Sequence, residues 1–527
     1  MCCMKKLFTL LPLLSIFTVT SCNFATPSNS IESKEEDSSI SSISTSDSIS
    51  SSTSSDSISS ESASESGSSS YEEDPDAVNP SFTYSQENYD DFFDPTKNVE
   101  VVVKISNEAI YKLAQYCNAG FTKSEMYHPC EVVIKIDGEE RFSGEEVGLR
   151  MKGNTSKNPN FVDDSGHLRE CVHFKMSFNK TFDSETQNDY YIRTWEDSNE
   201  RKARKDRTFG EMKKIDFKWN RNEDKTFTKE AYCKEMYRDA GVLAQNINLV
   251  KFTLKTDSEK QTYTYQAMEC VDSSMLKKHY AKAASKGNLY KGIYARADLT
   301  TDSLSGIGVE SETCDPWYSL KTNDDEPDHT LLTNVINVLN KRSTAEQSRN
   351  ELKEILNIDQ ILKYMALSWV AGNPDDLRNN ANNTYFYFDS TSNKMSIIPY
   401  DDDRVFGILH TWSVDTSDLP DYSTRMQGMT AAQGGNKVWQ KNPLFWKLIL
   451  SENQNAGYSS KWPVIQEYQN RYLELCKEYA NKYLDENRFQ EFTNQFVNAP
   501  SKDISDAGAD NQTFAYYANR KKGVLSL

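Results

Sequence analysis

One segment in the second half of the chain constrains the fold more than any other feature. Glu351–Ala371 has the periodicity of a helix rich in Leu, Ile and Met, and the following Gly372-Asn373-Pro374 cannot readily continue it. Thr384–Phe388 and Met395–Tyr400 have the pattern of strands, with a turn at Ser390–Asn393 between them. The sequence therefore predicts a buried helix, a loop, a β-hairpin and a second loop, in that order.

Both predicted loops are acidic. Asp375-Asp376 follows the helix, the amide-rich Leu377–Asn383 comes next, and Asp401-Asp402-Asp403 follows the hairpin. A spacing of two residues places the Asp401 and Asp403 carboxylates on one side of an extended strand end. This order matches the parts that a protein kinase uses: an Asp that orients the attacking hydroxyl, an Asn after it, and a later Asp that holds Mg²⁺. The strings H-R-D, D-F-G and G-x-G-x-x-G are absent, as is a Walker A loop.

The first half of the folded region is rich in strand signals and the second half in helix signals. The predicted strands are Val99–Ile105, Glu131–Ile136, Glu146–Met151, Cys171–Phe178 and Gln261–Val271, with one helix, Thr228–Ala240, stopped by Gly241. The later predicted helices are Ser274–Ser285, Thr330–Asn340, Glu351–Ala371, Pro443–Ser451 and Trp462–Asn487. We expect an α+β fold in which a β-rich part precedes a mainly helical part.

Several ordered motifs resemble the CotH kinase-like proteins, a family named for a spore-coat protein. They are Val147–Ser156, His173–Phe178, Gly287–Lys291, the stretch near Gly372–Asp375, and Ile398–Asp403 with Phe406-Gly407. The resemblance covers roughly residues 98–450 and rests on the order of the motifs, because each alone is weak. It implies an atypical, two-lobed kinase-like domain over residues 98–500, with the N-lobe at about 98–270, the C-lobe at about 271–500, and a C-terminal tail at 501–527.

The resemblance also implies roles for individual residues. Arg150, Lys152, Asn154 and Ser156 would approach the phosphates of ATP, and Lys175 would be the strand lysine, with Glu230, Glu235 or Glu269 as its partner. Of these glutamates, Glu269 lies in an apolar, strand-like run.

For the acidic loops, Asp375 would be the catalytic carboxylate, with Asp376 as the alternative. Asn383 would join Asp401 and Asp403 at the Mg²⁺ ion. Asn380 competes with Asn383, because its spacing from Asp375 is that of ordinary kinases. The implied reaction is transfer of phosphate from ATP to Ser or Thr of a protein.

The N-terminus has the form of a bacterial lipoprotein signal peptide. Lys5 and Lys6 precede an apolar run, Leu7–Val19, and Cys22 follows shortly after. The apolar run is shorter than the roughly 20 residues that a membrane-spanning helix needs. We expect residues 1–21 to be removed, Cys22 to be lipidated, and the protein to be secreted and held on the outer face of the cell membrane by its lipid alone.

Residues 22–80 are expected to be a disordered tether. From about Ser28 to Ser70 the sequence is Ser-rich and acidic and has no aromatic residue, so it cannot bury enough apolar surface to fold. Its serines could also serve as phosphate acceptors for the chain's own kinase domain. The net charge of −18 argues against nucleic acid as a partner, because phosphate contacts need clustered Lys and Arg.

Two other functions compete with kinase activity. The domain could be a surface binding protein or adhesin with little or no turnover, since a lipid anchor and a tether suit display equally well. A surface glycosidase would need a pair of carboxylates, and no pair stands out beyond the acidic residues already described.

Overall fold

The structure is a computed structural model of the whole chain. It describes residues 71–82, 87–118, 126–153, 156–184, 190–311, 314–407, 419–422, 438–450, 463–502 and 511–527. The chain divides after Ser68, and all of these residues belong to the second of the two compact units. They contain both helices and strands, which confirms the α+β class.

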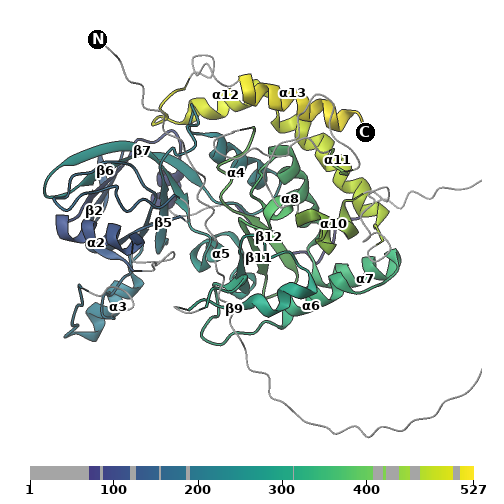
Figure 1. Cartoon of the computed structure of the whole chain (residues 1–527), viewed down its shortest axis with the longest axis horizontal. Helices are drawn as coiled ribbons and strands as arrows, with labels where there is room; N and C mark the ends of the chain where they lie inside the picture. Colours follow the sequence, from purple (N-terminus) through teal and green to yellow (C-terminus); the bar gives the residue numbers. More distant parts are fainter. Residues whose placement is uncertain are drawn as a thin grey trace, which may run out of the picture. The chain divides into compact units, whose positions relative to one another are not determined.

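The first half of this unit forms a closed β-barrel (Figure 1). Its strands are β1 (Val99–Lys104), β2 (His128–Ile136), β3 (Glu139–Met151), β4 (Phe174–Ser177), β5 (Lys214–Lys218), β6 (Ile247–Lys255) and β7 (Lys260–Glu269). Around the barrel the order is β1-β2-β3-β4-β5-β7-β6. Neighbours are antiparallel except β1 and β6, whose parallel pairing closes the barrel. Asp137 and Gly138 both have positive φ in the two-residue turn between β2 and β3.

One face of the barrel strands builds an apolar core, and the opposite face of three neighbouring strands carries charge. Phe174 and Phe217 are buried in that core. Arg150 on β3 pairs in register with Lys175 on β4, which pairs with Asp216 on β5. Because side chains alternate along a strand, these three polar residues lie side by side across the sheet, away from the core.

The second half contains a smaller sheet with the order β12-β11-β8-β10-β9. The strands are β8 (Asn288–Gly292), β9 (Ile307–Val309), β10 (Tyr318–Leu320), β11 (Thr384–Phe388) and β12 (Met395–Pro399). The predicted hairpin is therefore confirmed as β11 and β12. Every residue of these two strands is buried, as expected for a sheet that is covered on both faces.

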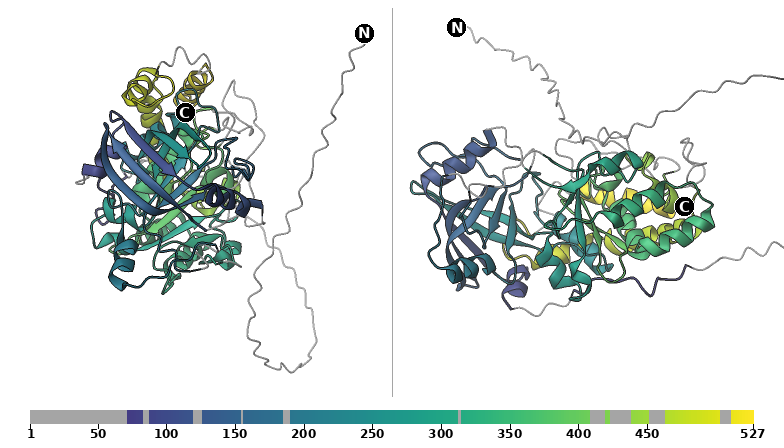
Figure 2. Two further views of the ribbon diagram at one scale, coloured as in Figure 1. Left: turned by 90° about the vertical axis from the view of Figure 1, so that its left-hand side faces the viewer. Right: turned by 90° about the horizontal axis from the view of Figure 1, so that it is seen from below.

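Most of the helices follow β7, and they are drawn mainly in green and yellow in Figure 2. The helices are α1 (Glu87–Phe93), α2 (Asn107–Asn118), α3 (Ser198–Asp206), α4 (Lys229–Asp239), α5 (Ser273–His279), α6 (Thr330–Asn340), α7 (Ala345–Ile355), α8 (Ile358–Ala371), α9 (Leu377–Asn380), α10 (Pro443–Leu448), α11 (Gln466–Tyr483), α12 (Glu486–Gln495) and α13 (Asn511–Leu525), with 3₁₀ turns at Ala284–Lys286, Thr301–Gly306 and Val438–Gln440. Helix α8 is almost wholly buried and contacts α4, α11 and β12. None of the described helices combines the length and apolar character needed to cross a membrane.

Three predicted helices are interrupted in the structure. The expected helix Ser274–Ser285 ends at His279, and a 3₁₀ turn follows at Ala284–Lys286. The expected helix Glu351–Ala371 is split into α7 and α8, because the Asn357 side chain accepts a hydrogen bond from the Gln360 amide and caps a new helix. The expected helix Trp462–Asn487 ends at Tyr483, and α12 begins at Glu486.

The ends of the expected domain also differ from the structure. Residues 71–82, here called the N-terminal strap, lie on the folded unit instead of belonging to a free tether. The Tyr71 and Tyr468 rings are 6.1 Å apart, and Val78 and Phe82 pack against a buried cluster. At the other end α13 lies within the predicted tail, and its Tyr516 hydroxyl donates to the Val370 carbonyl of α8 at 2.8 Å.

Candidate functional site

A buried lysine joins the barrel to the second acidic loop. Lys218 is the last residue of β5, and its side chain is only 3% exposed. Its ammonium lies 2.8 Å from a Glu230 carboxylate oxygen in the first turn of α4 and 2.7 Å from Asp401. Asp403 is 3.6 Å away. One cation thus holds a strand, a helix and an acidic loop together.

The charged groups around Lys218 shift one another's pKa values. Burial alone would lower the pKa of Lys218, but Asp401, Asp403 and Glu230 hold it well above its usual value. Burial would likewise raise the pKa of Asp401, yet Lys218 and Lys152 hold it below its usual range. Burial raises the pKa of Glu230 to about 7; the Lys218 ammonium lowers this pKa, and the Asp403 and Asp401 carboxylates raise it. The Lys218 ammonium and the Asp401 carboxylate are therefore both charged at neutral pH.

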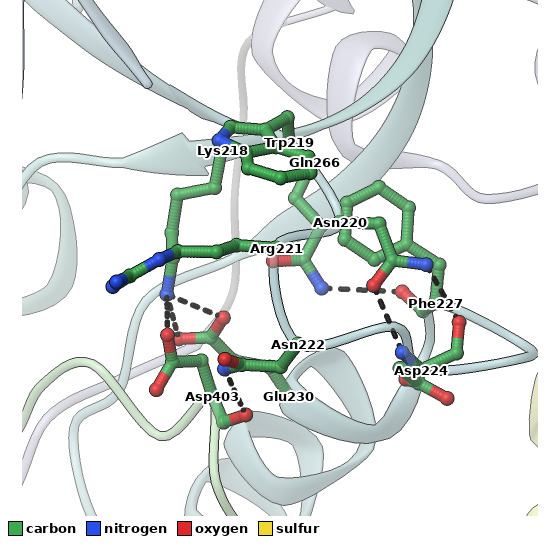
Figure 3. Close-up of a pocket in the computed structure, with 10 residues that line it drawn as sticks. All are labelled: Lys218, Trp219, Asn220, Arg221, Asn222, Asp224, Phe227, Glu230, Gln266 and Asp403. Carbon is green, nitrogen blue, oxygen red and sulfur yellow. Dashed lines mark hydrogen bonds and ion pairs between the residues drawn. The ribbon is translucent and has the colours of Figure 1, made fainter. Parts of the chain in front are cut away.

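A hollow opens beside Lys218, and Figure 3 shows its lining. The lining residues come from the end of β5, the loop after it, α4, β7 and the second acidic loop: Lys218, Trp219, Asn220, Arg221, Asn222, Asp224, Phe227, Glu230, Gln266 and Asp403. The Asn222 side-chain amide donates to the Asp403 carbonyl at 2.9 Å. The loop after β5 therefore holds the backbone of the acidic loop that lines the same hollow.

The first acidic loop begins where α8 stops. Gly372 caps that helix with a left-handed φ of 71°, and a Cβ atom there would lie 2.2 Å from the Tyr516 hydroxyl oxygen. The Asn373 side chain then accepts a hydrogen bond from the Asp375 amide at 2.9 Å. Glycine is required here by both backbone and space, and the turn it makes carries Asp375 out of the buried helix.

Three amide side chains donate to Asp375. Asn380 lies 2.7 Å from one carboxylate oxygen, and Asn382 and Asn383 lie 3.2 and 3.1 Å from the other. The pKa of Asp375 is raised to about 6, mainly by burial. The Asn380 and Asn382 hydrogen bonds act to lower this pKa, and the nearby Asp401 and Asp403 charges act to raise it. A half-buried carboxylate with this pKa is suited to accepting a proton near neutral pH.

Asp376 faces the protein interior. Its side chain accepts a hydrogen bond from the Asn379 amide at 3.0 Å, which caps the short helix α9, and another from the Ser368 hydroxyl. The Arg378 guanidinium is 3.5 Å away. Of the two candidate catalytic carboxylates, Asp376 is thus occupied by structural contacts.

The middle residue of the second acidic loop is also a structural residue. Asp402 accepts hydrogen bonds from Lys234 of α4 at 2.6 Å and from the Asn373 side chain at 2.7 Å. Asp402 is buried, whereas Asp401 and Asp403 on either side are only half-buried. Asp402 therefore points into the protein, whereas the half-buried Asp401 and Asp403 both lie near Lys218, and Asp403 lines the hollow.

The two candidate metal-ligating asparagines differ in their backbone contacts. The Asn383 carbonyl accepts a hydrogen bond from the Tyr400 amide at 3.0 Å, and its side chain also donates to the Asp375 carbonyl. The Asn380 carbonyl instead accepts one from the Ala295 amide. Asn383 is thus tied directly to the residue before Asp401.

Lys175 and Lys152 share one partner, which is none of the three glutamates expected for Lys175. Their ammonium groups lie 3.1 and 2.9 Å from the two carboxylate oxygens of Asp216. Glu230 binds Lys218, Glu235 binds Arg238, and Glu269 lies 3.2 Å from the His279 ring. The sequence left three glutamates open as partners of Lys175 and did not include Asp216, because Asp216 lies on β5, which was not predicted as a strand.

The remaining predicted residues lie around the same strands. The Arg150 guanidinium lies over the Tyr127 ring, 5.4 Å from its centre. Ser156 packs against Gly153, which has a φ of 104° and no room for a side chain. Asn154 and Cys22 lie outside the described residues.

Lys218, which lies at the centre of the candidate site, was missed from the sequence. Two signals point to it: Lys214–Lys218 alternates polar and apolar residues, and the helix that follows carries Glu230 in its first turn. A strand of five residues is short, however, and its lysine meets Asp401 across 183 residues of sequence.

Within the described residues, no three His, Cys, Asp or Glu side chains form a cluster that could hold a metal by themselves. Three carboxylates lie near Lys218; Glu230 holds its ammonium, and Asp401 and Asp403 of the second acidic loop are the oxygen donors that remain for a metal. Such a partial set of hard oxygens suits Mg²⁺, which usually takes one or two carboxylates and completes its shell with phosphate oxygens and water.

Comparison with known proteins gives a family match over most of the chain. The sequence model of the family described as CotH kinase protein matches residues 150–518. No curated protein matches the sequence. Among the solved structures that match is the toxin–antitoxin complex of HipA, HipB and operator DNA from Shewanella oneidensis MR-1, with 12% identity and a TM-score of 0.28. That match covers 59% of this chain and spans only 57% of the other.

Proposed function

Because the chain belongs to the CotH kinase protein family, we propose that it is a protein kinase that transfers the γ-phosphate of ATP to Ser or Thr residues. The observation that carries the proposal is the contact between Lys218, Glu230 and Asp401. In protein kinases a strand lysine must pair with a helix glutamate, and an Asp after a hairpin must reach the metal site. Here the order strand lysine, helix glutamate, loop carboxylate and hairpin carboxylate is the same.

Each charged residue has a role in this proposal. Lys218 binds phosphate oxygens, and Glu230 fixes the position of its ammonium. Asp375 accepts the hydroxyl proton while the acceptor oxygen bonds to the γ-phosphorus and the bond from that phosphorus to the bridging oxygen of ADP breaks. Its pKa of about 6 leaves it mostly ionised at neutral pH and ready to take that proton.

Asp401, Asp403 and Asn383 are the residues that would hold Mg²⁺. The bound ion would neutralise charge on the phosphate oxygens. The fit is supported by the donor set and by the two aspartates, which already attract one cation, the Lys218 ammonium. We favour Asn383 over Asn380 because Asn383 is hydrogen-bonded to Tyr400, next to Asp401.

We also propose that the kinase is displayed outside the cell. Support comes from the sequence alone: Lys5 and Lys6, the apolar run and Cys22 form a lipoprotein leader, and a Ser-rich acidic stretch follows. Serines of that stretch are candidate acceptors. In a bacterial host, Cys22→Ser should move the protein from the membrane fraction to the soluble fraction, and an unchanged distribution would contradict lipid anchoring.

The direct test of the proposed activity is transfer of labelled phosphate. The full chain is incubated with Mg²⁺-ATP, with and without an extract of exported proteins, beside Asp375→Asn. We expect incorporation on Ser or Thr in the wild type and a loss of at least about a hundredfold in the variant. Equal incorporation by both would contradict the role of Asp375. Binding of ATP without any transfer would favour a catalytically inactive surface binding protein.

A further inference from the structure

A second group of lysines lies near the Lys218 site and carries more positive charge than its partners neutralise. It consists of Lys152 and Lys175 from the barrel and Lys291 from β8 of the second sheet. Lys152 and Lys175 both bind Asp216, which is only 1% exposed. In the described part of the chain, no other carboxylate forms an ion pair with any of the three lysines. Among the described residues these three cations therefore have one ion-paired anion, Asp216, in a chain whose net charge is −18. Asp401 acts on Lys152 and Lys291 only from a longer distance.

Lys291 is the member of the group that forms no ion pair with any of the described residues. Its ammonium lies 5.0 Å from the centre of the Tyr400 ring and 6.0 Å from that of Tyr385. Lys152 lies 5.4 Å from the centre of the same Tyr400 ring, so this ring connects the lysine of the second sheet to those of the barrel. Tyr400 directly precedes Asp401, which brings the group next to the proposed metal ligands.

The surroundings of Lys291 disfavour its charge. Burial, together with Lys321, Lys175 and Lys152, lowers the pKa of Lys291 to about 8, although the Asp401 carboxylate raises it. A contact with an aromatic ring only partly offsets the loss of water around an ammonium. A half-buried cation among other cations is costly to keep, and such a cost is expected where a ligand supplies the missing negative charge.

We propose that Lys291 binds the phosphate chain of the nucleotide, together with Lys152 and Lys175. This inference rests on the proposed function and gives a role in ligand binding to Lys291, the last residue of the motif Gly287–Lys291. The phosphate chain of a nucleotide carries several negative charges and many acceptor oxygens, and three ammonium groups from two sheets can donate to it. Binding would then tie the second sheet to the barrel through the ligand.

The test compares Lys291→Met with the wild type in the full chain. Methionine keeps most of the length and apolar contact of the side chain and removes only the charge. Without ligand, Lys291→Met should melt at the same temperature or higher, because an uncompensated charge is removed. Its dissociation constant for Mg²⁺-ATP, measured by calorimetry, should rise about tenfold or more, whereas Lys291→Arg should bind more tightly than the methionine variant.

Lys321→Met is the matched control. Lys321 also acts on Lys291 through its charge, but it is paired with Glu310, so it reports the long-range effect of losing one positive charge near the site. We expect its effect on binding to stay within about threefold. Equal weakening in both methionine variants would overturn the proposal, as would Mg²⁺-ATP binding by Lys291→Met within about threefold of wild type.

The wild-type measurement separates this inference from the proposed function. If the wild type does not bind Mg²⁺-ATP, the kinase proposal fails, and inorganic pyrophosphate becomes the probe of the lysine group. Pyrophosphate binding that Lys291→Met weakens would still support an anion site at Lys291. If the wild type binds neither probe, both proposals are overturned.

Discussion

Asp375 and Asp376 are adjacent carboxylates with opposite surroundings. Asp375 is half-buried and accepts hydrogen bonds from three asparagine side chains, whereas Asp376 is buried and caps α9. Substitution separates these roles. Asp375→Asn should abolish transfer with little loss of stability, whereas Asp376→Ala should lower the free energy of unfolding by about 1–3 kcal/mol through the lost cap and the Ser368 contact. Chemical denaturation and phosphate incorporation, measured on both variants, check this. A stable but inactive Asp376→Ala would contradict the assignment.

The pKa of Asp375 sets the acid side of the pH profile. Since burial raises that pKa to about 6, the proton-accepting form is lost as the pH falls through 6, and kcat/KM should fall with it. Asn382 donates to Asp375 and lowers this pKa. Asn382→Ala should therefore move the acid limb to higher pH, which a pH series on both proteins measures. A limb that moves to lower pH would rule out Asp375 as the titrating group.

At the scale of elements, the Lys218 contact connects β5, α4 and the loop after β12. Lys218→Ala leaves three carboxylates close together without their cation, which should cost about 3–5 kcal/mol of stability and abolish stabilisation by Mg²⁺-ATP. Lys225→Ala, an exposed lysine in the loop after β5, is the control and should stay within about 0.5 kcal/mol of wild type. Unfolding in urea gives both values. A small effect of Lys218→Ala would contradict the central place of this contact.

Two glycines at helix ends provide a matched test of the turn before Asp375. Gly372 after α8 and Gly241 after α4 both have positive φ, but only at Gly372 would a Cβ meet another atom, the Tyr516 hydroxyl at 2.2 Å. Gly241→Ala should cost about 1 kcal/mol from backbone strain, and Gly372→Ala distinctly more. Thermal unfolding checks the order, and equal costs would mean that α13 does not support this turn.

The elements that the sequence predicted well are those whose pattern is local. The helix at Thr330–Asn340 and the hairpin strand at Thr384–Phe388 match their predicted bounds, because the periodicity and the turn residues lie within the segment itself. The strand of Lys218 and the partner of Lys175 were missed, since both depend on pairing between distant strands. Local sequence indicated Asp375 and the Asp401 loop, but it could not say which barrel lysine reaches them.

At the scale of the whole molecule, the N-terminal strap belongs to the folded unit although its sequence continues an acidic stretch. Val78 and Phe82 pack against the cluster that contains Tyr400, next to Asp401, and Lys394 binds Asp74. A chain that starts at residue 87 should therefore melt at a lower temperature than one that starts at residue 71. A chain that starts at residue 71 should match the full chain. Equal melting temperatures for the two shortened chains would contradict the contribution of the strap.

The proposed activity requires the barrel lysines and the two acidic loops to act on one nucleotide. The most direct measurement is a crystal structure of the full chain with Mg²⁺ and a non-hydrolysable ATP analogue. We predict phosphate oxygens at Lys218 and Lys291, the metal at Asp401, Asp403 and Asn383, and the Asp375 carboxylate facing the γ-phosphate. A nucleotide bound elsewhere, or a metal held without Asp401, would contradict the account.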